Sequence, residues 1–169
     1  MNRKTSSILL CILLLALASS QVAAQDAMTA TSSQRIHPVL IRNPQNRLLT
    51  IQIQSPAAET RLQSLTFSLS GSENIESLQL LLEGQEEPPL GAAQPAADRI
   101  TFRGTQPLKQ GANTLWLSCT LKTTASLLEK VDATCTSLVT SAGEVTVSDT
   151  TPGVQKRIGV ALRRHMDDN

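Results

Sequence analysis

Hydrophobic and polar residues alternate along most of the chain from residue 49 onward, and this period of two predicts β-strands. In residues 65–69, Leu65, Phe67 and Leu69 occupy one face of the strand, and Thr66 and Ser68 occupy the other. The inward positions of the other predicted strands are Leu49, Ile51 and Ile53; Leu78, Leu80 and Leu82; Ile100 and Phe102; Leu115, Leu117, Cys119 and Leu121; Val131, Ala133 and Cys135; Val145 and Val147; and Ile158, Val160 and Leu162. About eight such strands predict an all-β fold, an antiparallel two-sheet β-sandwich of jelly-roll-like type.

Turn-forming residues separate the predicted strands. Gly71, Gly143 and Gly153 mark short turns, and residues 84–98 contain three prolines and predict a long loop. Residues 124–130 (Thr-Ala-Ser-Leu-Leu-Glu-Lys) are the one segment with a helical pattern. We expect a short helical crossover between the two sheets there.

The N-terminus is typical of a secretory signal peptide. Arg3 and Lys4 supply its positive start, residues 8–18 form an uncharged apolar run of 11 residues, and small residues lead up to Ala24. The run is shorter than the ~20 residues that span a membrane, so we expect no membrane span. Cys11 lacks the small preceding residue of a lipoprotein site, so cleavage after Ala24 and export to the periplasm or cell exterior are favoured over lipid anchoring.

The chain is therefore predicted to hold one folded domain. After a signal peptide at residues 1–24, residues 25–34 are small and polar and are expected to form a disordered lead-in. The β-sandwich is expected to occupy residues 35–164, followed by a short tail at residues 165–169. The pattern shows neither an internal repeat nor a linker that would divide two domains.

The balance of charge does not indicate a nucleic-acid or membrane-surface partner. Without Arg3 and Lys4, the chain has 13 basic and 14 acidic residues, a net charge of −1. The basic run at residues 156–164 alternates charged and apolar positions, and we interpret it as a final edge strand with a charged outward face. A polyanion-binding patch is the alternative interpretation of this run.

Two cysteines, Cys119 and Cys135, remain after removal of the signal peptide. Both share the parity of the inward residues of their strands, and an exported protein permits a disulfide between them. Closing so small a loop would stabilise the fold by about 3 kcal/mol in the chain-entropy model. The alternative, which the sequence leaves open, is two free thiols buried as small hydrophobic side chains.

The sequence offers no catalytic or metal-binding arrangement, and no cofactor is expected. His37 and His165 lack the convergent ligands that a zinc site requires. No Gly-x-Ser-x-Gly motif marks an activated serine. Glu83, Glu86 and Glu87 lie in the proline-rich loop and are interpreted as a solubilising acidic bend.

Trp116 is the most informative candidate contact residue. It is the only Trp, and it has the parity of Ser118 and Thr120, opposite to the inward leucines of its strand. It is interpreted either as a platform for a sugar ring or as a packing residue, within the fold or at a junction with a neighbouring domain. Arg99 and Arg103, at outward positions of another predicted strand, join it as candidate contacts to a glycan or a domain interface.

Two segments resemble the β-sandwich domain that precedes the catalytic propeller in secreted bacterial sialidases of the BNR (Asp-box) type. One is residues 106–121 (Gln-Pro-Leu-Lys-Gln-Gly-Ala-Asn-Thr-Leu-Trp-Leu-Ser-Cys-Thr-Leu), continuing to residue 133. The other is residues 153–163 (Gly-Val-Gln-Lys-Arg-Ile-Gly-Val-Ala-Leu-Arg).

The resemblance implies an accessory domain without activity of its own. The family's propeller carries an Arg-Ile-Pro motif, Asp-boxes and a catalytic Tyr, and this sequence has none of the motifs and no Tyr. The chain ends at Asn169, about where such a propeller would begin, so we expect a truncated sialidase, a fragment or a stand-alone descendant. The expected partner is a sialidase propeller or a glycan. The alternative hypothesis is a stand-alone exported module that binds glycan or protein.

Overall fold

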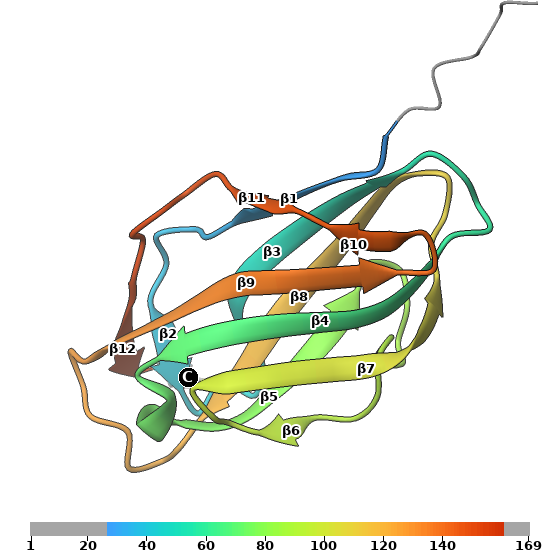
Figure 1. The fold of residues 1–169 in the computed structure, drawn as a ribbon. Helices are drawn as coiled ribbons and strands as arrows, with labels where there is room; N and C mark the ends of the chain where they lie inside the picture. The colour runs from blue at the N-terminus through green and yellow to red at the C-terminus, as the bar shows by residue number, and fades with distance from the viewer. Residues whose placement is uncertain (1–26, 161–169) are drawn as a thin grey trace, which may run out of the picture.

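Two β-sheets pack face to face in the computed structural model, which describes residues 27–160 (Figure 1). The first sheet has the strand order β11 (Val147–Asp149), β1 (Thr29–Ser33), β3 (Asn46–Ser55), β8 (Gly111–Leu121), β5 (Ile75–Leu82) and β6 (Gln94–Pro95). The second sheet, in front in Figure 1, has the order β2 (Val39–Ile41), β12 (Lys156–Val160), β9 (Lys130–Thr140), β4 (Arg61–Ser70) and β7 (Arg99–Pro107). Strand β10 (Gly143–Val145) pairs with β9, and a 3-10 turn, η1 (Ser72–Asn74), connects β4 to β5.

The core lies between the sheets and follows the alternation of the sequence. The inward residues of β3, β4, β5, β7, β8 and β9 are buried, as the pattern predicts. Phe67 of β4 and Phe102 of β7 are fully buried, and their rings meet edge to face with centroids 6.1 Å apart. Both rings belong to the second sheet, and burial of such large apolar side chains against the first sheet supplies most of the free energy that holds two sheets together.

The prediction of a two-sheet all-β sandwich is confirmed, but the sheets are mixed and have more strands than predicted. Residues 27–160 form twelve strands, and the pairs β1–β11 and β2–β12 are parallel. Val145 and Val147, which predict one strand, lie on two: β10 joins the second sheet and β11 joins the first. The extra strands are two to five residues long, and segments this short carry little alternation.

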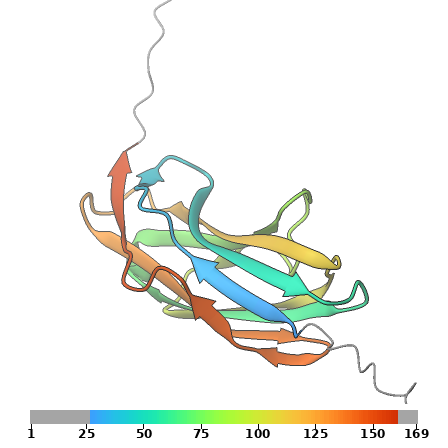
Figure 2. The ribbon, with the colours of Figure 1, turned by 90° about the horizontal axis from the view of Figure 1, so that it is seen from above.

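The expected disordered lead-in is wrong for its described part. Residues Thr29–Ser33 form β1, which pairs with β3 on one side and β11 on the other (Figure 2). Ala30 and Ser32 point inward and are buried. Because their side chains are so small, the sequence shows no hydrophobic alternation, and backbone pairing holds the strand in place.

The predicted helical crossover at residues 124–130 is a crossover but not a helix. The segment connects β8 of the first sheet to β9 of the second as a loop. The amide of Leu128 donates to the carbonyl of Ile158 at 3.1 Å, and the amide of Ser126 donates to Asn74 Oδ1 at 3.0 Å. These partners lie outside the segment, so they replace the internal hydrogen bonds that a helix would need.

The final strand also differs from its prediction. β12 lies between β2 and β9, so it is not an edge strand. Lys156 is only 3% exposed, and with Ile158 it points inward instead of forming a charged outward face. The signal peptide with Cys11, the C-terminal half of the basic run, His165 and the tail lie outside the described residues.

Candidate functional site

Trp116 lies on the outer face of the first sheet and is half-buried. Its strand neighbours are Thr50 of β3 and Leu81 of β5. The guanidinium carbon of Arg47 lies 3.9 Å from the centroid of the Trp116 ring, a cation–π contact. Because this contact covers one face of the ring, Trp116 does not offer that face as an open platform for a sugar.

Arg99 and Arg103 do not join Trp116 in one site. Both are exposed residues of β7, at the edge of the second sheet, and they alternate there with the inward Ile100 and Phe102. Trp116 points outward from the other sheet, so the two arginines lie on the opposite face of the sandwich. Any glycan or domain contact therefore uses one set or the other.

The two cysteines are free, buried thiols in the structure, on β8 and β9 of opposite sheets. Burial raises the pKa of both the Cys119 and the Cys135 thiols from 9.0 to about 12, and for Cys119 the nearby Lys156 charge offsets part of the effect. Neither thiol is therefore suited to act as a nucleophile, because the reactive thiolate is disfavoured.

These pKa values predict a loss of stability at high pH. Below pH 9 the thiols are protonated in both folded and unfolded chains, and between about pH 9 and 12 only the unfolded thiols ionise. The free energy of unfolding is expected to fall through this range, by at most about 4 kcal/mol per thiol. Unfolding in urea under reducing conditions, compared with the Cys119→Ala/Cys135→Ala variant, measures the effect. If the two pH profiles run parallel, the prediction is wrong.

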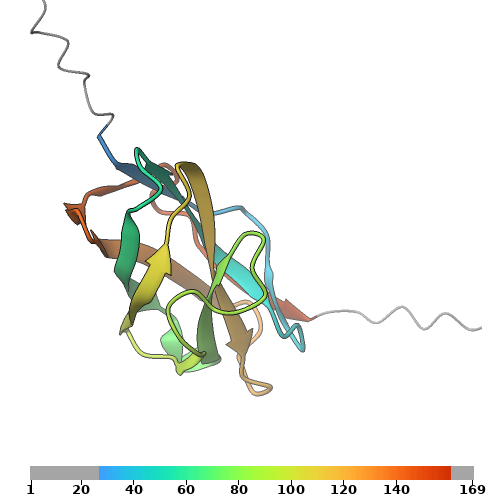
Figure 3. The same cartoon turned by 90° about the vertical axis from the view of Figure 1, so that its right-hand side faces the viewer.

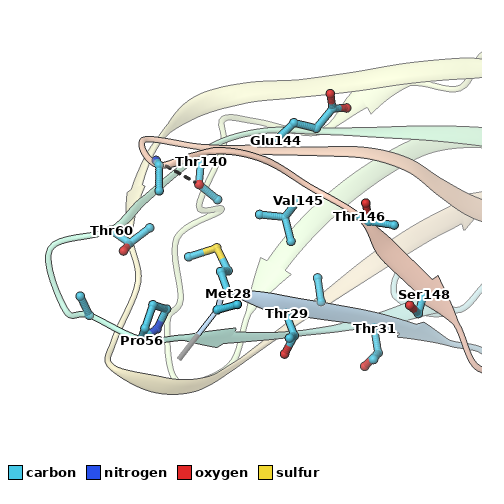
Figure 4. Close-up of a pocket in the computed structure, with 14 residues that line it drawn as sticks. Met28, Thr29, Thr31, Pro56, Thr60, Thr140, Glu144, Val145, Thr146 and Ser148 are labelled. Atoms are coloured by element: carbon cyan, nitrogen blue, oxygen red, sulfur yellow. Dashed lines mark hydrogen bonds between the residues drawn. The ribbon is translucent and has the colours of Figure 1, made fainter. Parts of the chain in front are cut away.

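A pocket lies at the edge of the sandwich, between β1 and β10 (Figure 4). It encloses about 920 Å³, and Met28 and Val145 face one another across it. Its polar groups are threonine and serine hydroxyls, and Glu144 is the single ionisable side chain in the described lining. That carboxylate accepts a hydrogen bond from Ser137 Oγ at 2.8 Å. A lone carboxylate without a base or nucleophile beside it does not form a catalytic pair.

Residues 27–160 contain no group of three or more His, Cys, Asp or Glu side chains able to hold a metal ion. Within the same residues, no helix is long and apolar enough to cross a membrane.

The end of the sandwich at the β8–β9 loop exposes apolar side chains. Leu127, Leu128 and Val160 are 53%, 69% and 43% exposed, and we call these three residues the apolar end. Leu127 and Val160 border a groove of about 410 Å³ whose base includes the buried Ile41. Leu128 has a positive φ of 72°, a conformation that is unfavourable for a residue with a branched side chain. From the sequence, this segment was interpreted as a short helical crossover, and its leucines were not singled out.

A basic pocket lies where the chain crosses from β1 to β2. Its lining includes Arg35, His37, Arg47 and Lys156, and it encloses about 240 Å³. Sequence reasoning missed it, because the basic run was interpreted as a solvated face. The sequence did contain an indication of this pocket. Lys156 lies two residues before the inward Ile158, so in a strand both side chains point to the same face.

Residues 89–144 match the family model described as the N-terminal domain of BNR-repeat neuraminidase. The resemblance inferred from the sequence is confirmed over this segment, which contains β7, β8 and β9 with Trp116 and both cysteines. The match is to an N-terminal domain of such enzymes. No curated protein matches the sequence.

One solved structure supports the fold. The Hadza microbial sialidase Hz136 is similar with a TM-score of 0.62 and 19% identity, over 77% of this chain and 31% of that chain. This chain thus spans about a third of the length of that sialidase. The seventh ScaB type I cohesin from Pseudobacteroides cellulosolvens aligns over 84% of this chain and 97% of its own, with 10% identity and a TM-score of 0.40. That value is too low to carry an argument.

Proposed function

We propose that this chain is an exported, non-catalytic accessory domain of the sialidase type, and that its apolar end packs against a catalytic propeller. The observation that supports the packing is the exposure of Leu127, Leu128 and Val160 together at one end of the sandwich. The similarity to part of the Hadza sialidase supports the accessory role, because more than two thirds of that chain lies outside the similar region.

The apolar end has the properties of a surface that another domain covers. A fully buried leucine or valine side chain stabilises a contact by about 1.5–3 kcal/mol relative to its exposed state. Three such residues form the apolar centre that is typical of a domain interface.

Hydrogen bonds hold the loop that presents the two leucines. Asn74 lies in the turn η1 and accepts two hydrogen bonds of 3.0 Å. Its side-chain Oδ1 accepts from the amide of Ser126, and its backbone carbonyl accepts from the amide of Lys122. Leu128 is held by its hydrogen bond to Ile158 of β12. A loop fixed at both ends presents its side chains without a large loss of conformational entropy on binding.

The test is binding to the catalytic propeller of a BNR-repeat sialidase from the source organism, measured by calorimetry. We expect Leu127→Ser/Leu128→Ser to weaken binding at least about tenfold, which corresponds to about 1.4 kcal/mol. Ile36→Ser is the matched control, because Ile36 is 84% exposed on the β1–β2 connection and should leave binding unchanged.

Two outcomes would contradict the proposal. One is equal weakening by the double variant and the control, or no binding at all by the wild-type chain. The other is turnover of a fluorogenic sialoside by the purified chain alone, because the proposal assigns the chemistry to the propeller.

A further inference from the structure

The basic pocket contains cations without a carboxylate to balance them. Arg35 reaches it from the connection between β1 and β2, Arg47 from β3, and Lys156 from β12, and the imidazole of His37 also lines it. No aspartate or glutamate is present in its described lining. Unbalanced cations around a concave surface favour the binding of an anion.

Lys156 is the buried cation of the pocket. The residue is 3% exposed, and its Nζ donates a hydrogen bond to the backbone carbonyl of Arg35. An ammonium group has three N–H donors, so one such bond leaves donors available. Burial lowers the pKa of Lys156, the thiol of Cys119 opposes this effect, and the charges of Arg35 and Arg47 lower the pKa further. Positive charges crowd this site, and an anion would relieve their repulsion.

A β-bulge fixes Arg47 at the rim. The pairing of β3 with β8 shifts between Arg47 and Leu49, and Leu48 inside the bulge is buried. The bulge lets Leu48 and Leu49 both point inward while Arg47 stays on the outside. There the ring of Trp116 supports the guanidinium at 3.9 Å, so that Arg47 is positioned before any ligand arrives.

The wall beside Lys156 is rigid. Asn46 accepts the amide of Leu40 at 2.7 Å and donates to the carbonyls of Leu40 and Asn43 at 3.0 and 3.1 Å. Because its carboxamide is already hydrogen-bonded to the backbone and to the side chain of Asn43, Asn46 shapes the pocket and leaves the binding of a ligand to the cations. A site with its donors already in place loses little entropy when it binds.

We propose that the pocket formed by Arg35, Arg47 and Lys156 binds an oxyanion, the carboxylate or sulfate group of a small ligand. An oxyanion would accept charge-assisted hydrogen bonds from the free donors of Lys156 and from the two guanidinium groups. The volume of about 240 Å³ admits such a group with part of the molecule that carries it. Two sources share this chemistry: a free inorganic anion and the acidic group of a sugar.

The experiment is an NMR titration of the isotope-labelled chain at constant ionic strength with sodium sulfate, sodium acetate and sodium glucuronate, and with glucose as the neutral control. Saturable shifts at residues of the pocket are expected, with a Kd on the order of 1 mM for at least one anion. Glucuronate binding at least tenfold tighter than acetate identifies a sugar acid, and equal affinities identify the oxyanion alone; both results support the site. Glucose is expected to cause no shift.

Variants separate the site from general charge effects. Arg35→Ala and Arg47→Ala remove exposed side chains and are expected to weaken binding about tenfold each. Arg103→Ala, on the opposite face, is the matched control and should bind like the wild type. The proposal is overturned if no anion shifts the residues of the pocket, or if all three variants weaken binding equally. Lys156→Met serves as a third variant if it folds, and the two arginine variants decide the matter if it does not.

This site is independent of the proposed docking function. Leu127 and Val160 do not line the basic pocket, and Arg35 and Arg47 do not line the apolar groove. Absence of anion binding together with intact propeller binding contradicts the oxyanion site alone, and the reverse result contradicts the docking proposal alone.

Discussion

Phe102→Ala is expected to destabilise the domain by about 3–5 kcal/mol, the range for removal of a fully buried aromatic side chain. Phe102 is 0% exposed and packs edge to face on Phe67, so its loss leaves a cavity between the two sheets. Because domains of this size are stable by only about 5–15 kcal/mol, much of the total would be lost. Urea unfolding measures the effect as a lower midpoint with an unchanged slope.

Ile36→Ala is the control for this substitution. Ile36 is 84% exposed, so its truncation should change the free energy of unfolding by no more than about 0.5 kcal/mol. If Phe102→Ala lowers the free energy of unfolding as little as the control does, the two sheets do not meet at this residue.

Gly71→Ala is expected to destabilise the domain by about 3 kcal/mol, although only one methyl group is added. Gly71 has φ of +70°, which is strained for alanine, and a Cβ there would overlap the carbonyl oxygen of Lys130 and lie 3.1 Å from Val131 Cγ1. The chain crosses between the sheets at this point, so neither β9 nor the turn η1 can move away without disturbing the other.

Gly153→Ala separates the two causes. Gly153 has φ of +77°, and nothing lies within 4 Å of its added Cβ, so this variant should lose only about 1 kcal/mol to backbone strain. If Gly71→Ala and Gly153→Ala lose the same amount of stability, the close approach of Gly71 to Lys130 is contradicted. Thermal or urea unfolding of both variants gives the comparison.

Alternation predicted the central strands because their inward residues are large. Leu65, Phe67 and Leu69 stand out from the polar residues between them, and each is buried in the structure. The same rule failed for β1, where Ala30 and Ser32 are inward but too small to produce a hydrophobic signal. Strands that depend on backbone pairing to a neighbour are not visible in a pattern of side chains.

The candidate site was harder to predict, because it depends on contacts between distant segments. Trp116 was singled out, but the sequence did not show that Arg47, 69 positions earlier, lies over its ring. Residues 124–130 have a helical pattern but do not form a helix. The amides of Ser126 and Leu128 instead donate hydrogen bonds to Asn74 and Ile158. Lys156 was assigned to the charged outward face of a final edge strand, although it shares the parity of the inward Ile158 and is buried in the structure.

Hydrogen–deuterium exchange with and without the sialidase propeller tests the accessory role most directly. If the apolar end docks on the propeller, the amides of the β8–β9 loop around Leu127 and those at the end of β12 should exchange more slowly in the complex. The amides of the exposed strand β7 around Arg103 should exchange at the same rate in both states. Unchanged exchange around Leu127 and Val160, or slower exchange at β7 alone, would contradict the account.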